Sequence, residues 1–381
     1  MPLWLQLLNL KKVIISVSND LSTDQRVHKV CIALSQWNCD ILLVGCFRET
    51  KIPLERKYKI HRLSPVFKKG PFFYAEFNIR LFLFLLFHNA DFIVANDLDT
   101  LLANYLASKL KSIPVVYDSH ELFTEVPELA HRKFVKSIWE RIEKFIFPKL
   151  KYVYTVNNTI ANIFKQKYNV EVKVIRNVSH KNMVTKFDSK NELGLPTDKK
   201  IIILQGAFIN VERGAEEAVL AMQYVEGAIL LIIGGGDVFN KLRKMAVDLD
   251  LTPKVKFIDK VPYNRLMHYT ANADIGLSLD KDTNLNYKYS LPNKLFDYIQ
   301  AGVPVLVSNL VEPKKIISEF NIGEIIESHN PKHIAEKIMH MLSATDKIEL
   351  WKTNLKKAAE VYCWENEEQK LKEIYKKVIE D

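Results

Sequence analysis

Residues 92–117 read FIVANDLDTLLANYLASKLKSIPVVY, and this stretch shows the pattern that decides the fold. Residues 92–95 and 115–117 are short apolar runs rich in Val, which is typical of buried strands. Between them, residues 98–111 carry apolar side chains at the spacing of an amphipathic helix. A strand, a helix and a second strand in this order predict a parallel pair with the helix packed on one face of the sheet.

The same pattern recurs on both sides of this stretch. Further apolar runs predict strands at residues 13–17, 41–44, 152–156, 201–204, 229–233, 255–258, 275–279 and 305–307. The polar residues 179–200, which include Gly194 and Pro196, interrupt the pattern and predict a linker. We therefore predict an α/β protein with two Rossmann-like, doubly wound parallel sheets. One domain is expected in residues 1–180 and the second in residues 195–364.

The last predicted helix, residues 365–381, carries an apolar stripe that another element must cover. Its members are Leu371, Ile374, Tyr375 and Val378. Packing on either domain would cover the stripe, and we favour a return to the first. Ligands of open parallel sheets bind beyond the carboxyl ends of the strands. Two such sheets facing each other predict a central cleft, so the residues just after each strand are the candidates for function.

The charge of the chain favours an anionic partner. Lys and Arg number 54 against 45 Asp and Glu, which gives a formal net charge of +9 among 381 residues. Nucleic acid, an anionic membrane surface and a phosphorylated substrate all fit this excess. We expect no nucleic-acid partner, because the basic residues are scattered and no recognition motif is present.

Several classes of protein and site are disfavoured by the sequence. The cysteines Cys31, Cys39, Cys46 and Cys363 lack Cys-x-x-Cys spacing, so we expect reduced thiols and no metal site. The N-terminus has its basic residues after the apolar run, which is the reverse of a secretion signal. The most apolar run, residues 81–87, is shorter than the roughly 20 residues of a membrane span. We therefore expect a cytoplasmic protein that is not integral to a membrane.

Residues 290–298, SLPNKLFDY, are the strongest candidate for an anion site. Pro292 presets the start of a helix, whose first turn exposes backbone N–H groups. Lys294 lies in that turn, where a cation opposes the helix dipole and is most simply explained by a bound phosphate. Asp297 lies almost one turn later and could accept hydrogen bonds from a ribose. The alternative is that Lys294 and Asp297 are solvated residues on an outer face.

Two further features of the second half could contact phosphate. Arg213 follows a predicted strand just before a helix opens near Gly214, where a guanidinium could bind a phosphate through two hydrogen bonds. On the alternative interpretation Arg213 pairs only with Glu212 or Glu216. Residues 234–236 are three glycines after a strand, which fits either a close ligand approach or a tight turn.

Polar residues also follow the predicted strands of the first half. His120 lies in the run YDSHEL directly after a strand, and is either a site residue or a structural histidine. Residues 18–26 form a long polar segment that suits recognition of a hydroxyl-rich acceptor. Its candidate acceptor-binding residues are Asn19, Asp24 and Arg26. Asp97, after another strand, is a further acceptor candidate, although it could instead cap the following helix.

Together these motifs resemble the GT-B glycosyltransferases, specifically the retaining family 4 enzymes (glycosyl transferases group 1). The resemblance extends over nearly the whole chain. It is carried by the runs VYDSHEL, IGGG with Leu242, and VPY with Leu266, and most specifically by LPNKLFDY followed by AG-x-PV.

This resemblance implies roles for individual residues. His120 matches the family histidine near the reacting sugar, and Arg213 matches the basic residue that neutralises the donor diphosphate, which Lys294 would also meet. Asp297 matches the second acid of the Glu-x7-Glu motif, which holds the ribose. The turn at residues 260–263, with Tyr263, would meet the nucleobase. The remaining donor-binding residues are Gly206, Gly235, Val261, Leu266, Ser290, Asn293 and Leu295.

The chain departs from the family pattern at two positions. The first acid of Glu-x7-Glu falls at Tyr289, and the usual Arg after the glycine of the first strand in the second domain falls at Ala207. These departures leave open whether activity is weakened or lost.

The expected reaction transfers a sugar from a nucleoside diphosphate, UDP- or GDP-linked, to an acceptor hydroxyl with retained anomeric configuration. Arg213, Lys294 and the helix start at Pro292 would stabilise the leaving diphosphate without a metal. The acceptor is expected to be a glycan or a lipid-linked glycan, in cell-surface polysaccharide or glycolipid assembly.

Residues 67–87 combine Lys68, Lys69 and Arg80 with several Phe residues and Tyr74. This mixture suits an anionic membrane surface and a peripheral position at its inner face. A buried helix with a charged outer side is the alternative. Two other functions remain open: a nucleotide-sugar epimerase of the same fold, or a non-catalytic partner subunit that binds sugar nucleotides.

Overall fold

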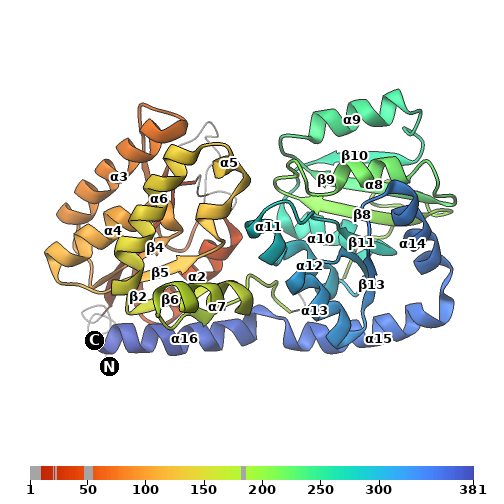
Figure 1. Cartoon of the computed structure of the whole chain (residues 1–381). Coiled ribbons are helices and arrows are strands. Elements are labelled where there is room, and N and C mark those ends of the chain that lie inside the picture. The colour runs from red at the N-terminus through yellow and green to blue at the C-terminus, as the bar shows by residue number, and fades with distance from the viewer. Residues whose placement is uncertain (1–9, 20, 22–23, 47–54, 182–185) are drawn as a thin grey trace. The chain divides into compact units, whose positions relative to one another are not determined.

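The computed structural model describes residues 10–19, 21, 24–46, 55–181 and 186–381. Parts of the predicted N-terminal segment and of the polar segment 18–26 lie outside these residues. The chain divides into two compact units (Figure 1). Unit 1 comprises Met1–Arg176 together with Glu368–Asp381, and unit 2 comprises Asn177–Glu367.

Unit 1 contains a seven-stranded sheet in the order β3-β2-β1-β4-β5-β6-β7. Every adjacent pair is parallel. The strands are β1 (Lys11–Ser16), β2 (Cys39–Cys46), β3 (Lys59–Leu63), β4 (Phe92–Asn96), β5 (Val115–Ser119), β6 (Tyr152–Thr155) and β7 (Lys173–Val174). The central strands β4 and β5 are almost wholly buried, as the near-continuous apolar runs predict.

Helices cover both faces of this sheet. They are α2 (Gln25–Gln36), α3 (Gly70–Phe87), α4 (Leu98–Lys111), α5 (Pro127–Ala130), α6 (Lys133–Ile146) and α7 (Asn158–Tyr168), with short 3₁₀ turns at Phe123–Glu125 and Phe147–Lys149. Apolar residues of α3 and α4 share one core cluster with β1, β2 and β4, among them Phe77, Leu81 and Ala107. These two helices therefore lie side by side on one face of the sheet.

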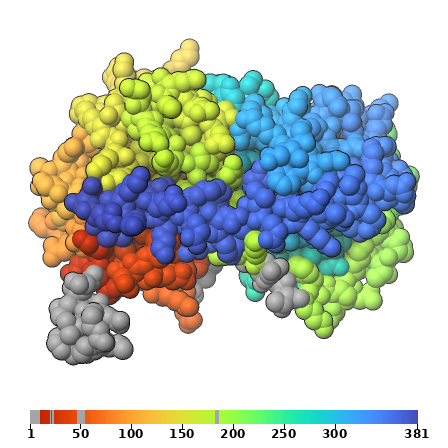
Figure 2. All heavy atoms as spheres, turned by 90° about the horizontal axis from the view of Figure 1, so that it is seen from below, coloured from red at the N-terminus to blue at the C-terminus, as the bar shows by residue number. Residues whose placement is uncertain are grey.

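The C-terminal helix α16 (Trp364–Glu380) contacts unit 1 from Glu368 onward. Its predicted stripe is buried, and Tyr375 lies against Phe92 of β4 and Tyr154 of β6. The Tyr375 and Tyr154 hydroxyls are 3.1 Å apart. Figure 2 shows this helix, in dark blue, at the surface of unit 1 beside the red N-terminal elements. The apolar stripe of α16 is therefore buried by packing against the sheet of unit 1.

Unit 2 contains a six-stranded parallel sheet in the order β10-β9-β8-β11-β12-β13. Its strands are β8 (Lys200–Gly206), β9 (Ala228–Gly234), β10 (Val255–Asp259), β11 (Ile275–Ser278), β12 (Val305–Ser308) and β13 (Gly323–Ile326). Its helices are α8 (Ala215–Ala221), α9 (Phe239–Asp248), α10 (Tyr263–Ala271), α11 (Leu285–Tyr289), α12 (Asn293–Gln300), α13 (Val311–Phe320), α14 (Pro331–Ser343) and α15 (Thr345–Val361).

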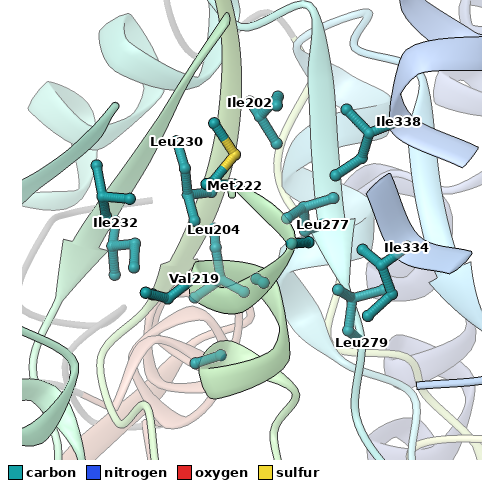
Figure 3. Packing of buried hydrophobic residues seen from close by; sticks show 14 of the residues in the cluster. Ile202, Leu204, Val219, Met222, Leu230, Ile232, Leu277, Leu279, Ile334 and Ile338 are labelled. Carbon is teal, nitrogen blue, oxygen red and sulfur yellow. The ribbon is translucent and has the colours of Figure 1, made fainter. Parts of the chain in front are cut away.

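The core of unit 2 joins the inner strands to the helices that cover them. Leu204, Leu230 and Leu277 of three neighbouring strands meet Val219 of α8 and Ile334 of α14 (Figure 3). All five side chains are buried. The predicted α/β fold with two parallel sheets is therefore confirmed.

The structure adds to the prediction at the sheet edges. Strands β3, β7 and β13 were not predicted, and all three are edge strands. The sequence of β3 is KIHRL, β7 has two residues, and only the last residue of β13 is buried. Edge strands are often short and charged, so they lack the apolar run that identifies a central strand.

The most apolar run, residues 81–87, is the last part of the 18-residue helix α3, which lies within the segment 67–87. Within the described part of the chain, α3 alone has the length and composition to cross a membrane. Four of its residues, Phe73, Phe77, Leu81 and Leu85, are buried against the sheet of unit 1. This packing identifies one side of α3 as part of the core.

Each sheet reverses its strand order at one point. In unit 1 the chain moves from β1 to β2 in one direction and from β4 to β5 in the other, and in unit 2 the reversal lies between β8 and β11. At such a point two neighbouring loops diverge and leave room for a ligand beyond the carboxyl ends of the strands. The two reversals, called switch points below, are therefore where site residues are expected.

Candidate active site

Arg213 lies at the switch point of unit 2, in the loop between β8 and α8. The residues on either side of it, Glu212 and Gly214, both have left-handed backbone conformations, with φ of 67° and 73°. A side chain at Gly214 would place its Cβ 2.1 Å from the carbonyl oxygen of Leu279. The backbone N–H of Lys281 donates to the carbonyl of Glu212 at 3.0 Å. The loop after β8 is thereby fastened to the loop after the neighbouring strand β11.

Arg213 and Lys294 converge on one buried carboxylate, Asp280. Nη1 of Arg213 is 2.8 Å from Oδ1 of Asp280, and Nζ of Lys294 is 3.5 Å from Oδ2. Only 1% of the Asp280 side chain and 15% of the Lys294 side chain are exposed. The Arg213 guanidinium also lies 4.2 Å from the ring centroid of Tyr287, which restricts it further. Two loops and the first turn of α12 thus place two cations around one anion.

The charges of this cluster leave a net positive site. Burial would raise the pKa of Asp280, but Lys294 and Arg213 hold it below its ordinary value. Burial lowers the pKa of Lys294, and Asp280 opposes this effect. With Asp280 ionised and both basic groups protonated, the cluster carries one excess positive charge in a largely desolvated position. A positive group in such a position stabilises a developing negative charge well.

The structure contradicts the alternative interpretations, in which Lys294 is solvated and Arg213 pairs only with Glu212 or Glu216. Lys294 lies in the first turn of α12, as predicted, but it is not a solvated side chain. Arg213 forms its ion pair with Asp280, which lies 67 residues further along the chain. Asp280 escaped the sequence analysis, although its position just after a predicted strand was a signal for it.

Asp297 was predicted to accept hydrogen bonds from a ribose. In the structure its carboxylate is buried and is already hydrogen-bonded to other residues of the protein. Oδ1 accepts hydrogen bonds from Ser179 Oγ, at 2.6 Å, and from the Tyr263 hydroxyl, and Oδ2 accepts from Nε2 of Gln205 at 3.0 Å. Asp297 therefore joins α12 to α10 and β8. It also fixes the orientation of Tyr263, whose predicted contact with the nucleobase would come through other atoms.

The glycine run after β9 has a structural explanation. Gly234 has a φ of 144°, and a Cβ there would lie 1.8 Å from the carbonyl oxygen of Gly206. The backbone N–H of Ile209 donates to the carbonyl of Gly235 at 2.6 Å. Gly234 thus allows the ends of β8 and β9 to approach closely at Gly206.

The other predicted donor-binding residues differ in accessibility. Asn293 is exposed at the start of α12, while Val261 and Leu266 are half-buried near the start of α10. The Ser290 hydroxyl donates to the carbonyl of Tyr287 at 2.9 Å. The Leu295 side chain is fully buried, and its backbone N–H donates to the Pro292 carbonyl within the first turn.

Unit 1 carries a second cluster, a chain of alternating charges at its own switch point. Arg26 donates to both carboxylate oxygens of Asp118, with its shortest contact at 2.7 Å. His120 lies 3.2 Å from Asp118 through Nε2 and 3.2 Å from Asp97 through Nδ1. The His120 backbone N–H also donates to Asp97 at 2.8 Å. The order Arg26, Asp118, His120, Asp97 gives no net charge when all four groups are ionised.

The pKa values follow from this arrangement. Burial would lower the pKa of His120, but the two neighbouring carboxylates raise it to about 10. Burial would also raise the pKa of Asp118, yet Arg26 and His120 hold it at about 2. Burial raises the pKa of Asp97 to about 7, against the influence of His120. A carboxylate beside each ring nitrogen favours the doubly protonated imidazolium, which is not a general base.

Asp97 has an unusual backbone, with φ 58° and ψ 168° at the junction of β4 and α4. A non-glycine residue in this region of φ/ψ space is strained by about 1–3 kcal/mol. Asp97 occupies the N-cap position, but its side chain makes no capping hydrogen bond. The capping alternative is therefore wrong, and the carboxylate is directed to His120 instead.

Three predicted acceptor-binding residues have structural contacts. Arg26 is a correction, since it is buried and its guanidinium donates to Asp118 and to the Ile175 carbonyl. Asp24 caps α2 by accepting from the backbone N–H of Val27 at 3.0 Å. Asn19 donates to Asp24 at 2.8 Å. These contacts cross-link the loop after β1.

The residues described by the structure contain no group of three or more His, Cys, Asp or Glu side chains that could hold a metal ion. The four cysteines are buried and free. Burial raises the pKa of the Cys39 thiol to about 11, which disfavours the thiolate needed for metal binding. The predicted lack of a metal requirement stays a prediction for experiment.

Two doubly wound parallel-sheet units of seven and six strands give the chain the fold of the GT-B class of α/β proteins. Glycosyltransferase Family 4 matches residues 24–178, and Glycosyl transferases group 1 matches residues 185–358. The chain belongs to this family of glycosyltransferases.

Curated relatives match part of the chain. An uncharacterized glycosyltransferase of Methanocaldococcus jannaschii is 26% identical over 199 residues, 51% of this chain and 49% of that protein. A GDP-mannose-dependent alpha-(1-6)-phosphatidylinositol monomannoside mannosyltransferase of Mycobacterium tuberculosis is 25% identical over 131 residues, 32% of each chain. The matches thus span about half and one third of these two relatives.

Solved structures share the fold over nearly the full length. A sucrose-phosphate synthase from Thermosynechococcus elongatus has a TM-score of 0.79 at 14% identity, covering 97% of this chain and 99% of its own. HepE of Anabaena in complex with UDP and glucose has a TM-score of 0.73 at 13% identity, with 96% and 100% covered. At such identities the likeness concerns the fold.

Proposed function

We propose that the chain transfers a glycosyl group from a nucleoside diphosphate sugar to an acceptor hydroxyl, with retained anomeric configuration. The observation that carries the proposal is the convergence of Arg213 and Lys294 on buried Asp280 at the switch point of unit 2. The bond from the anomeric carbon to the diphosphate breaks, and a bond from that carbon to the acceptor oxygen forms. The acceptor proton leaves with the diphosphate or to water.

Each residue of the unit 2 cluster has a distinct part in this reaction. The leaving diphosphate gains negative charge as its bond to the sugar breaks, so Arg213 and Lys294 stabilise it. Asp280 holds both cations in place without cancelling their charge completely. The backbone N–H groups in the first turn of α12 add a positive dipole at the same point. Binding of the intact diphosphate is therefore assigned to unit 2.

His120 serves as a fixed cation in unit 1, rather than as a base. Asp97 and Asp118 hold its ring from both sides and favour the charged form. A fixed imidazolium with 20% of its side chain exposed can orient a sugar hydroxyl or stabilise nearby negative charge. We assign it to the side of the reacting sugar.

The donor is expected to be UDP- or GDP-linked. Relatives support both bases, because HepE of Anabaena was solved with UDP and glucose and the mycobacterial mannosyltransferase is named as GDP-mannose-dependent. The acceptor is expected to be a glycan or a lipid-linked glycan, met by a cytoplasmic protein at the inner face of a membrane. The same mycobacterial relative is named as a phosphatidylinositol monomannoside mannosyltransferase.

Thermal denaturation with a panel of nucleotides tests the donor site. UDP, GDP, ADP, TDP and their common sugar adducts are added to the wild type, to Lys294→Ala and to the control Lys288→Ala. A ligand at about one hundred times its Kd adds roughly 2.7 kcal/mol of stability. One nucleotide should raise the Tm of the wild type and of Lys288→Ala, which alters an exposed ion pair with Asp282, but not of Lys294→Ala. If no nucleotide raises the Tm, the proposed donor site is wrong.

Metal removal tests the proposed mechanism directly. Turnover is expected to persist in excess EDTA, because Arg213 and Lys294 supply the positive charge that Mg²⁺ would otherwise give. Activity that disappears in EDTA and returns with Mg²⁺ would contradict this part of the proposal.

The two alternative functions, a nucleotide-sugar epimerase and a non-catalytic partner subunit, are distinguished from glycosyl transfer by the product formed. An epimerase would convert the donor to another sugar nucleotide with no acceptor present. A non-catalytic partner subunit, the alternative raised by Tyr289 and Ala207, would bind the nucleotide but release no nucleoside diphosphate with any acceptor.

A further inference from the structure

Helix α3 exposes far more apolar surface than its packing requires. Its 18 residues have a mean hydropathy of 1.3, yet only four of them are buried. The outward side carries Phe72, Ile79, Leu83 and Phe87, spaced about one or two turns apart. Phe72 is 70% exposed and Phe87 is 83% exposed. The core of unit 1 therefore explains one side of this helix and leaves the other side unexplained.

Two later helices, α4 and α6, carry further exposed apolar side chains. On α4, Leu106 and Leu110 are exposed one turn apart, and Leu110 is 68% exposed. On α6, Phe134, Ile138 and Phe145 are exposed at the spacing of one helical stripe, and Phe134 is 77% exposed. Large exposed apolar side chains that gather on neighbouring helices mark a candidate interaction site.

The three helices lie next to one another on one side of unit 1 (Figure 1). Helix α4 packs against α3, with Ala103 and Ala107 in the same core cluster as α3. It also contacts α6, where the ring centroids of Tyr105 and Phe145 are 6.3 Å apart. Trp139 of α6 meets Tyr74 of α3 at 5.5 Å. We call the outward side of α3, α4 and α6 the apolar helix face.

Exposed basic side chains lie on α4, on α6 and in the 3₁₀ turn after α6. Lys109, Lys133, Arg141, Lys144 and Lys149 are all exposed. The Lys149 ammonium lies 3.2 Å from the ring centroid of Phe145, so its aliphatic chain follows the apolar surface. Basic side chains around aromatic and aliphatic residues suit the boundary between anionic headgroups and acyl chains.

The acidic groups nearby are largely compensated. Glu76 of α3 accepts hydrogen bonds from the backbone N–H groups of Val66 and Phe67 and from Arg80. Lys136 of α6 lies 2.9 Å from Glu125 and 3.9 Å from Glu140, so it is shared between two carboxylates. The face therefore presents its positive charges to a partner. A second copy of the chain would bring the same lysines against one another, which disfavours self-association.

We propose that the apolar helix face docks the protein on an anionic lipid bilayer, with Phe134 and Phe145 of α6 among the inserted side chains. This inference rests on the proposed function, because docking on a bilayer would give the enzyme access to a membrane-borne acceptor. It goes beyond residues 67–87, because α4 and α6 supply more than half of the exposed apolar side chains named above.

Flotation with lipid vesicles tests this surface, using the full chain. Vesicles of phosphatidylcholine alone are compared with vesicles that contain about 30% phosphatidylglycerol. We expect the wild type to float with the anionic vesicles and much less with the neutral ones. Added salt should weaken the binding, because it screens the lysines.

A matched pair of double variants gives the control. Phe134→Glu with Phe145→Glu should lower the vesicle partition coefficient at least about tenfold. Leu350→Glu with Val361→Glu makes the same charge change at exposed apolar positions of α15 in unit 2, and should bind like the wild type. Both pairs alter exposed side chains, so equal Tm values will show that both variants are folded.

Three outcomes would overturn the docking proposal. The wild type could remain in solution with anionic vesicles, or the α6 variant could bind as well as the α15 variant. Alternatively, sedimentation could show a dimer that the α6 variant disrupts, with no vesicle binding. None of these needs turnover. Glycosyl transfer to a water-soluble acceptor, measured by the nucleoside diphosphate released, should survive the α6 substitutions, so failure of glycosyl transfer and failure of docking are distinguishable.

Discussion

The switch points of the two units are built from the same types of side chain but differ in net charge. In unit 1, two cations and two carboxylates alternate from Arg26 to Asp97, so the charges balance. In unit 2, two cations share the single carboxylate of Asp280. A balanced cluster fixes orientation and suits a neutral, hydroxyl-rich ligand, whereas an unbalanced one attracts a diphosphate. Under the proposed function, this difference assigns the donor phosphates to unit 2 and the sugar side to unit 1.

The largest expected effect is at Lys294. Lys294→Met keeps much of the side-chain volume and should lower turnover by about a hundredfold, the scale of a lost charge-stabilising group. Burial already disfavours the charged form of Lys294, so the free energy of unfolding should not fall appreciably. Steady-state kinetics and urea denaturation measure the two effects. The control Lys288→Met should change neither.

A purely structural ion pair would give the opposite result for Lys294→Met. Stability would fall while turnover of the folded fraction stayed near that of the control. Such an outcome would remove the contrast between the two clusters.

The sequence predicted the central strands because their environment is simple. A strand buried on both faces must be apolar along its whole length, so β1, β4, β8 and β9 were recognised within a few residues. Edge strands face solvent and can be polar, so β3, β7 and β13 were missed.

The site was predicted in part, for a related physical reason. Lys294 conflicts with the local helix dipole, and Arg213 stands beside a helix start, so both were visible within their own segments. Their shared partner Asp280 and the burial of Arg26 depend on contacts between residues 67 and 92 positions apart. Periodicity and local spacing carry no information about such pairs. The pairing follows only once the strand order is known.

The next largest expected effect is the contribution of His120 to the pH dependence of the free energy of unfolding. Its folded-state pKa of about 10 lies above the ordinary value of 6.5. The stabilisation is therefore complete below pH 6.5 and is lost as the pH rises through about 10. Between these values the free energy of unfolding of the wild type should fall, relative to His120→Gln, by more than about 1.4 kcal/mol, the equivalent of one pKa unit.

Urea denaturation across this pH range measures the effect, with His131→Gln, at an exposed histidine, as the control. Parallel pH profiles for the wild type and His120→Gln would show that the alternating charges of unit 1 do not hold an imidazolium.

The smallest expected effect is on the stability of two variants at Asp97, which together separate backbone strain from side-chain charge. Asp97→Asn and Asp97→Gly both remove the carboxylate beside His120, but only glycine tolerates φ 58° with ψ 168°. Asp97→Gly should therefore be more stable than Asp97→Asn by about 1 kcal/mol. Chemical denaturation of the two variants at one pH is sufficient. Equal stability would mean that the backbone at this position stores no strain.

The central claim is that the unbalanced charge of unit 2 binds a diphosphate. Calorimetric titration of UDP and GDP against uridine and guanosine isolates the contribution of the phosphates. For the wild type, one nucleoside diphosphate should bind at least about a hundredfold more tightly than its nucleoside, since charge-assisted hydrogen bonds are the strong ones. In Arg213→Met with Lys294→Met this ratio should fall close to one, with the nucleoside affinity unchanged. A ratio that persists in the double variant would place the diphosphate elsewhere and contradict the account.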